Sequence, residues 1–134
     1  MIFITVQEVI NEHAKLIHTY GGLSGIRDMG LLASAVDMPR MAVFKKYLHP
    51  TVFDKAAAYL FHIICNHPFI DGNKRTGTAI ALAFLKINGI RIKIAEKQKI
   101  LALEELVVYT AESKATKKQI ANFFKECSPK KNWI

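Results

Sequence analysis

The segment from His67 to Thr76 gathers side chains that could bind phosphate and accept a proton. It reads His-Pro-Phe-Ile-Asp-Gly-Asn-Lys-Arg-Thr. Lys74 and Arg75 supply two cations, and a guanidinium can hold a phosphate through two parallel N–H donors. Gly72 has no side chain to keep a phosphate away from the backbone. His67, at the other end, could accept the proton of an attacking hydroxyl. The segment therefore predicts a phosphate-binding site with a proton acceptor beside it.

Asp71 is out of place beside a phosphate unless a cation lies between the two. Mg²⁺ in proteins often takes one or two carboxylates and completes its shell with substrate oxygens and water. We therefore expect Asp71 to bind Mg²⁺, with the alternative that it caps the following helix. Phe69, between two polar positions, is expected to point inward and anchor the loop. His67 as a structural residue and Lys74 and Arg75 as plain surface charges are the simpler alternatives.

Two apolar stretches flank this segment and are expected to be buried helices. The first begins at Thr51, with Asp54 three residues on as in a capping box, and is apolar nearly all round. It must end near Asn66, because Pro68 disfavours helical geometry in the residue before it. The second runs from about Asn73 to Asn88 and closes at Gly89. The loop thus ends at a helix N-terminus, where free N–H groups favour an anion.

The rest of the chain predicts further helices and little else. Capping residues and helical spacing predict helices after Thr5 and after Asp28, the second stopped by Pro39. Other expected segments are a loop or short hairpin over 41–50, a strand or extended connector over 90–95, helices over 97–111 and 117–126, and an exposed basic tail over about 128–134 on which Trp133 could dock. The sum is a single all-α domain, 1–134, of about six helices.

Composition and charge narrow the class of protein. The chain has 134 residues, 51% of them hydrophobic, which suits one domain with a real core. No apolar run is long enough for a membrane helix and no signal peptide is recognisable, so a cytoplasmic protein is expected. The two cysteines suggest neither a disulfide framework nor a zinc site. The formal charge is +8, and residues 86–134 hold 11 basic against 5 acidic side chains. This excess favours a polyanionic partner, with a solvated lysine-rich surface as the alternative.

The segment His67–Thr76 resembles the signature of the Fic/Doc superfamily, H-x-F-x-D/E-G-N-G-R-x-x-R, in its Doc-like, "death-on-curing" form H-x-F-x-D-x-N-K-R-T. A second stretch, Gly21 to Ala35, is similar to the family's upstream block. The resemblance implies a mostly helical Fic domain. It implies that His67 is the proton acceptor, Phe69 the buried anchor and Asp71 the Mg²⁺ ligand. The implied catalytic residues are His67, Asp71, Lys74 and Arg75, and the implied phosphate-binding residues are Gly72, Asn73, Lys74, Arg75 and Thr76.

Two positions depart from the full Fic signature and bear on the group transferred. Lys74 replaces its second glycine and Thr78 replaces its last arginine. Fic enzymes with the full signature transfer AMP; a lysine would crowd that anion nest, and loss of the arginine removes a phosphate clamp. Both changes match the Doc branch, which is associated with phosphorylating a translation elongation factor. We therefore expect a protein-modifying transferase that moves a phosphoryl group from a nucleoside triphosphate, ATP above all, to a Ser or Thr hydroxyl of a translation protein, with AMP transfer as the alternative.

The resemblance also implies partners. Internal Fic inhibition uses a helix with the pattern S/T-x-x-x-E-G/N, which this sequence lacks, so control by a separate antitoxin is expected, as in a toxin–antitoxin pair. By analogy, Met41–Pro50 could be a flap that positions a target. An RNA-binding or RNA-cleaving toxin is a further alternative, since the C-terminal third is basic. It is less favoured because the lysines there do not alternate with an aromatic platform; the aromatic residues, expected in the core, are Tyr109, Phe123 and Phe124.

Overall fold

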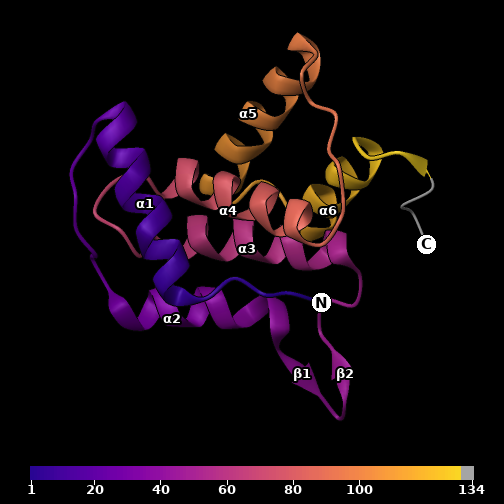
Figure 1. The fold of residues 1–134 in the computed structure, drawn as a ribbon, viewed down its shortest axis with the longest axis horizontal. Helices are drawn as coiled ribbons and strands as arrows, with labels where there is room; N and C mark the ends of the chain where they lie inside the picture. The colour runs from indigo at the N-terminus through magenta and orange to yellow at the C-terminus, as the bar shows by residue number, and fades with distance from the viewer. Residues whose placement is uncertain (131–134) are drawn as a thin grey trace.

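The computed structural model describes residues 1–130. Within them the chain forms six α-helices, one 3-10 helix and one two-stranded hairpin (Figure 1). The elements are α1 (Val6–Tyr20), α2 (Met29–Asp37), η1 (Met38–Arg40), β1 (Ala42–Val43), β2 (Lys46–Tyr47), α3 (Val52–Asn66), α4 (Asn73–Ile87), α5 (Lys97–Ala111) and α6 (Lys117–Glu126). The expected all-α fold with a short hairpin is confirmed. Among the helices described, none has the length and hydropathy to cross a bilayer.

Local capping chemistry sets most of the helix starts. Thr5 with Glu8 and Thr51 with Asp54 form the predicted capping boxes at α1 and α3, and Asp28 caps α2. Thr116 forms a third box, with Gln119, at α6. Each of these side chains accepts a hydrogen bond from a first-turn N–H that has no partner inside the helix. A few neighbouring residues therefore determine where each of these helices begins.

Helix α3 lies at the centre of the molecule, as its all-round apolar sequence predicts. The residues Ala56, Ala57, Ala58, Tyr59, Leu60 and Ile63 have no exposed surface. α4 packs closely on it, because Gly77 has no side chain. A Cβ at that position would lie 3.1 Å from Cγ1 of Ile64 and 3.2 Å from the carbonyl oxygen of Leu60. Figure 1 shows α3 and α4 running side by side through the middle of the bundle.

The hairpin stands at the opposite end of α3 from His67. β1 and β2 pair Ala42 with Tyr47 and Val43 with Lys46. The two turn residues, Phe44 and Lys45, have positive φ, as a type I′ turn requires. The hairpin leads into the N-terminus of α3, whereas His67 follows its C-terminus, about 22 Å along the helix. Figure 1 shows it projecting from the bundle there, so the base of this flap is one helix length from the predicted site.

The structure decides between two expectations for residues 90–95, corrects the expectation for Tyr109 and describes only part of the expected tail. Residues 90–95 form an extended connector rather than a strand, with the Lys93 N–H donating to the Cys127 carbonyl at 2.8 Å. Tyr109 was expected in the core but is 42% exposed, because α5 turns other residues inward, whereas Phe124 is fully buried. Of the expected exposed tail, Ser128 is buried and Lys130 is exposed; Trp133 lies outside the described residues.

Candidate functional site

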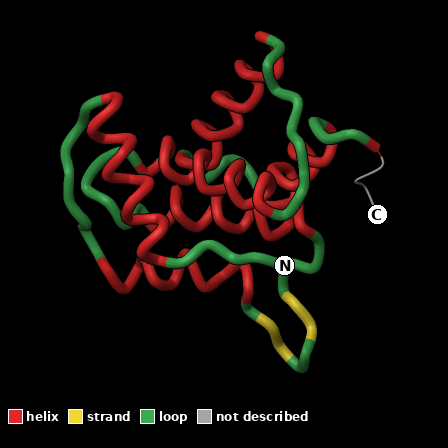
Figure 2. Tube along the Cα trace, viewed as in Figure 1, coloured by secondary structure: helices red, strands yellow, loops and turns green. Residues whose placement is uncertain are grey.

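The loop between α3 and α4 lies against the connection between α1 and α2 (Figures 1 and 2). We call residues 22–28 of that connection the clasp. The Ile70 N–H donates to the Gly25 carbonyl at 3.1 Å, and the N–H groups of Arg27 and Asp28 both donate to the Pro68 carbonyl, at 2.7 and 3.0 Å. Because loop backbone needs such partners when it leaves water, the clasp fixes the shape of the loop.

His67 ends α3 in a left-handed conformation, with φ 50° and ψ 54°. A residue without a glycine's freedom adopts this conformation at a cost of about 1–2 kcal/mol. Pro68 has no N–H with which to cap the last carbonyls of the helix. Arg27 replaces it: its Nε donates to the His67 carbonyl at 2.7 Å and its Nη2 to the Asn66 carbonyl at 2.9 Å. The guanidinium of the clasp therefore holds His67 in place.

Asp71 is exposed, and two backbone amides orient its carboxylate. Oδ2 accepts from the Leu23 N–H at 3.0 Å and Oδ1 from the Gly72 N–H at 2.9 Å. These bonds, that of Leu23 first, hold the pKa of Asp71 below its usual value, so the carboxylate is ionised. The N-cap of α4 is Gly72, with no side-chain cap in the described chain. The alternative that Asp71 caps this helix is therefore wrong.

The N-terminus of α4 faces the same space, and none of the described side chains accepts a hydrogen bond from its first-turn amides. Amides in this position carry the positive end of the helix dipole and favour an anion. Lys74 and Arg75 lie in this turn and are exposed. The Arg75 guanidinium stacks over the ring of Tyr20, 4.3 Å from its centroid, at the end of α1. Two cationic side chains thus lie in the first turn of α4, beside its amides.

These groups line one end of a cavity of about 970 Å³. Its polar wall comprises Tyr20, His67, Asp71, Gly72, Asn73, Lys74, Arg75 and Thr78. Its other wall is mainly apolar and comes from α3, α4 and α5, with Ile64, Leu82, Leu103 and Val107 among its residues. A polar end joined to an apolar chamber of this size suits a small molecule or cofactor with a charged and an uncharged part.

Asn73 and Phe69 brace the loop from inside. The Asn73 side chain accepts from the Phe69 N–H at 3.0 Å and donates to the Phe69 carbonyl at 2.9 Å. The Phe69 ring is fully buried, so the expectation that it points inward is confirmed. Thr76 is also fully buried and is not part of the cavity wall. Of the residues predicted to bind phosphate, Thr76 is the one that the structure keeps away from the cavity.

Gly72, which lines the cavity, also has a reason within the fold to lack a side chain. Its φ of +80° is strained for residues with a side chain. A Cβ there would meet Cδ1 of Ile17 at 3.2 Å and the imidazole of His13 at 3.6 Å. The missing side chain therefore lets the loop approach α1.

His13 and Arg27 contact the loop, and Tyr20 contacts Arg75 at the start of α4; the sequence alone did not single out any of the three. His13 had one signal: it follows Val9 by four residues and precedes Ile17 by four, so it lies on the apolar stripe of its helix. A polar residue on such a stripe needs a partner. Nothing in the sequence names that partner, because the loop lies far along the chain.

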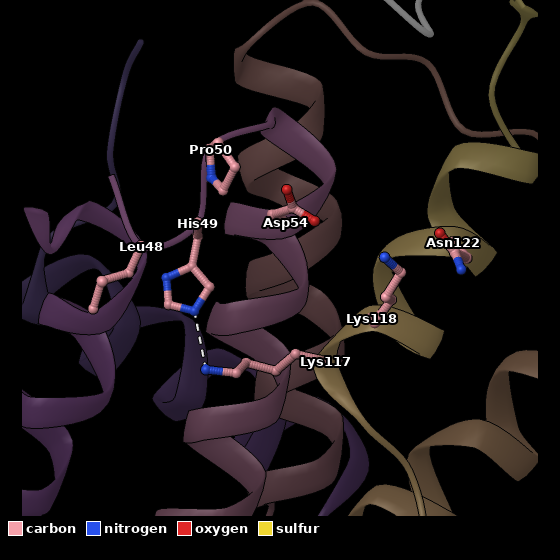
Figure 3. Close-up of a pocket in the computed structure, with 7 residues that line it drawn as sticks. All are labelled: Leu48, His49, Pro50, Asp54, Lys117, Lys118 and Asn122. Carbon is pink, nitrogen blue, oxygen red and sulfur yellow. Dashed lines mark hydrogen bonds between the residues drawn. The ribbon is translucent and has the colours of Figure 1, made fainter. Parts of the chain in front are cut away.

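A second, smaller cavity of about 240 Å³ lies between the hairpin base and α6 (Figure 3). Beside it Lys117 donates through Nζ to Nε2 of His49 at 3.0 Å and of His62 at 3.1 Å. Burial first, and then the Lys117 charge, lowers the pKa of His62 to about 4. Both imidazoles thus act as neutral acceptors. None of the predicted site residues lines this cavity.

The sequence of this chain is similar to those of known proteins. Residues 3–85, which run from before α1 into the last turn of α4, match the model of the Fic/DOC family. Over 73 residues the chain is 45% identical to "Toxin Doc" of Mycolicibacterium smegmatis, covering 54% of this chain and 56% of that protein. Over 92 residues it is 34% identical to "Protein kinase doc" of Escherichia phage P1, covering 69% and 72%. The matched region contains both the clasp and the loop, and this chain belongs to the Fic/DOC family.

Proposed function

We propose that this chain is a Doc-like toxin that transfers a phosphoryl group from ATP to a serine or threonine hydroxyl of a translation protein of the elongation factor class. The observation that carries the proposal is the convergence of His67, Asp71, Lys74 and Arg75 on one cavity at an uncapped helix N-terminus. The relative named protein kinase supports phosphoryl transfer, and the relative named toxin supports a toxin role.

The phosphate chain would bind at the polar end of the cavity. The first-turn amides of α4 and the charges of Lys74 and Arg75 are complementary to a polyanion. The Arg75 guanidinium is already oriented by the Tyr20 ring, so less rotamer freedom is lost on binding. These residues bind and orient the nucleotide, which is most of what a protein contributes to phosphoryl transfer.

Asp71 fits the role of a Mg²⁺ ligand. Its carboxylate is ionised, and each oxygen accepts one backbone hydrogen bond, which leaves lone pairs for a cation. The described residues contain no cluster of three or more His, Cys, Asp or Glu side chains for a metal. One carboxylate with nucleotide oxygens and water is the arrangement that Mg²⁺ often takes. When bound, Mg²⁺ would neutralise charge on the phosphate chain.

His67 would accept the proton in the transfer step. The substrate hydroxyl oxygen forms a bond to the γ-phosphorus, and the bond from that phosphorus to the β–γ bridging oxygen breaks. ADP leaves with the electron pair, and the hydroxyl proton passes to an imidazole nitrogen of His67. The exposed position of His67 on the cavity wall gives a protein hydroxyl access to it.

Lys74 and Thr78 favour phosphoryl over AMP transfer. Lys74 places a charged side chain where the full Fic signature has glycine. Thr78 lines the cavity, but its hydroxyl donates to the Lys74 carbonyl at 2.8 Å and it carries no charge. A second arginine clamp one turn into α4 is therefore missing from this position.

Radiolabelled ATP tests the proposal. The purified chain, Mg²⁺ and a bacterial lysate are incubated with ATP labelled at the γ- or the α-phosphate. We expect γ-label alone on one translation protein, and no label with a folded His67→Ala variant. Label from α-ATP would establish AMP transfer instead. Absence of both labels from every protein, with the chain folded, would overturn the proposal.

A separate antitoxin is the proposed regulator, as the relative named toxin suggests. A translation protein as substrate also implies that the chain acts in the cytoplasm. Co-expression with the neighbouring gene tests the first point. We expect growth arrest from the chain alone and growth with the pair. An antitoxin role is contradicted if the chain alone is harmless while active in the labelling assay.

A further inference from the structure

His13 lies behind the loop and not in the cavity. It is 4% exposed on α1, and its Nε2 is 2.8 Å from the carbonyl oxygen of Asp71. A carbonyl oxygen only accepts, so Nε2 carries the proton and donates. The imidazole also stacks on the Phe69 ring, with centroids 3.8 Å apart and planes at 5°. His13 therefore contacts the loop through a hydrogen bond and through its ring face.

The hydrogen bond from His13 to the Asp71 carbonyl orients the whole peptide group between Asp71 and Gly72. The peptide between Asp71 and Gly72 is planar and trans, so its C=O and N–H point in opposite directions. Drawing the carbonyl toward α1 directs the Gly72 N–H away from α1, where it meets Oδ1 of Asp71 at 2.9 Å. One imidazole N–H thus sets the direction of a loop amide and, through it, of the Asp71 carboxylate.

We propose that His13 is a positioning residue for nucleotide binding: its Nε2–H holds the Asp71–Gly72 peptide so that the carboxylate and the start of α4 face the phosphate chain. This inference rests on the proposed function of the cavity. The proton acceptor is held separately, since Arg27 and not His13 binds the His67 carbonyl. His13 therefore acts on nucleotide affinity and leaves proton transfer unchanged.

Two substitutions separate the hydrogen bond from the ring contact. His13→Gln keeps an N–H donor without the aromatic ring, and His13→Phe keeps the ring without the donor. His18→Gln, at an exposed position of the same helix, is the matched control. The measurements are the Kd for Mg-ATP by calorimetry, kcat and KM from γ-label transfer, and Tm. His13→Leu replaces the phenylalanine variant if that variant does not fold, since it also lacks the donor.

We expect the variant without a donor to raise Kd and KM for ATP about tenfold, with kcat within about twofold of wild type. His13→Gln should stay within about threefold of wild type and His18→Gln should match it. The inference is overturned if the variant without a donor binds Mg-ATP as tightly as wild type. It is also overturned if the glutamine variant loses as much affinity, or if kcat falls while Kd is unchanged.

A further readout keeps this inference separate from the proposed function. If the wild-type chain binds no Mg-ATP, the proposed function fails. The amide resonance of Gly72 in the nucleotide-free protein still tests His13, because it reports the orientation of the peptide. We expect it to move in His13→Phe or His13→Leu and to stay close to its wild-type position in His13→Gln. A resonance that stays in place without the donor overturns the role of His13.

Discussion

The side chain of Thr76, near the start of α4, carries a buried hydroxyl group. It has no exposed surface, and its Oγ1 has no hydrogen-bond partner within the described residues. A buried hydroxyl without a partner costs free energy, because folding removes its bonds to water. The resemblance to the family suggests that Thr76 binds phosphate, whereas its burial suggests that it only packs.

Replacing Thr76 by valine distinguishes these roles. Valine keeps the shape and removes the unpaired hydroxyl, so the free energy of unfolding should rise by about 1 kcal/mol. The Kd for Mg-ATP should not change. Urea denaturation and calorimetry measure the two quantities. Thr78→Val is the matched control, because the Thr78 hydroxyl has a partner in the Lys74 carbonyl and its loss should not stabilise the chain. Weaker nucleotide binding in Thr76→Val would show that this hydroxyl reaches the phosphate.

At the scale of single residues, the sequence predicted the loop residues that line the cavity but not the distant residues that hold the loop. His67, Asp71, Lys74 and Arg75 lie on one cavity wall because they are neighbours in the chain. His13 and Arg27 bind the same loop from 58 and 40 residues away. Such contacts depend on how the helices pack. The spacing of apolar residues in one helix shows which face is buried, but not which distant segment lies against that face.

At the scale of elements, the clasp and the loop are fitted to each other at Gly22. Its φ is +115°, and a Cβ there would lie 2.7 Å from Oδ2 of Asp71. Gly21, next to it, has a φ of +85°, but no atom of residues 1–130 lies within 4 Å of such a Cβ. The two glycines share the left-handed backbone and differ in whether a methyl group would meet the carboxylate.

Gly22→Ala and Gly21→Ala should therefore have different effects on binding. Both should lose about 1 kcal/mol of stability, because alanine disfavours positive φ. Only Gly22→Ala should weaken Mg-ATP binding, since its methyl group displaces the Asp71 carboxylate. Thermal unfolding and calorimetry check the pair. Equal Kd values for the two variants would show that the position of this carboxylate does not govern binding.

Elements with local start signals were predictable, and those defined by packing were less so. Threonine with a glutamate or aspartate three residues on marks α1 and α3. Residues 90–95 alternate apolar and basic as a strand does, yet they have no neighbouring strand in the described fold. Tyr109 fits a helical stripe, but α5 buries Leu103, Val107 and Thr110 instead.

At the scale of the whole molecule, the stability should depend on pH through His62. Burial first, then the charge of Lys117, lowers the pKa of His62 from 6.5 to about 4 in the folded chain. The unfolded chain takes up a proton near pH 6.5, where the folded chain does not. Stability from this group is therefore complete above pH 6.5 and is lost as the pH falls toward 4.

We expect the Tm to fall between pH 7.5 and pH 5, and to fall less in His62→Phe, which cannot take up a proton. Thermal unfolding at a fixed salt concentration measures both. Burial also lowers the pKa of His49, so the titration of His49 still makes the Tm of His62→Phe depend on pH. A wild-type Tm that does not change over this range would contradict the neutral state of His62.

The clasp has a consequence for how this signature can be used outside its own chain. The ten residues from His67 to Thr76 contain every side chain expected to act on the nucleotide, yet the loop takes its shape from Arg27, Leu23 and His13. A peptide or an α3–α4 fragment would carry the motif without the geometry. Grafting it onto another helical hairpin would need α1 and the clasp as well, so the smallest transferable unit runs from α1 to α4, about the first two-thirds of the chain.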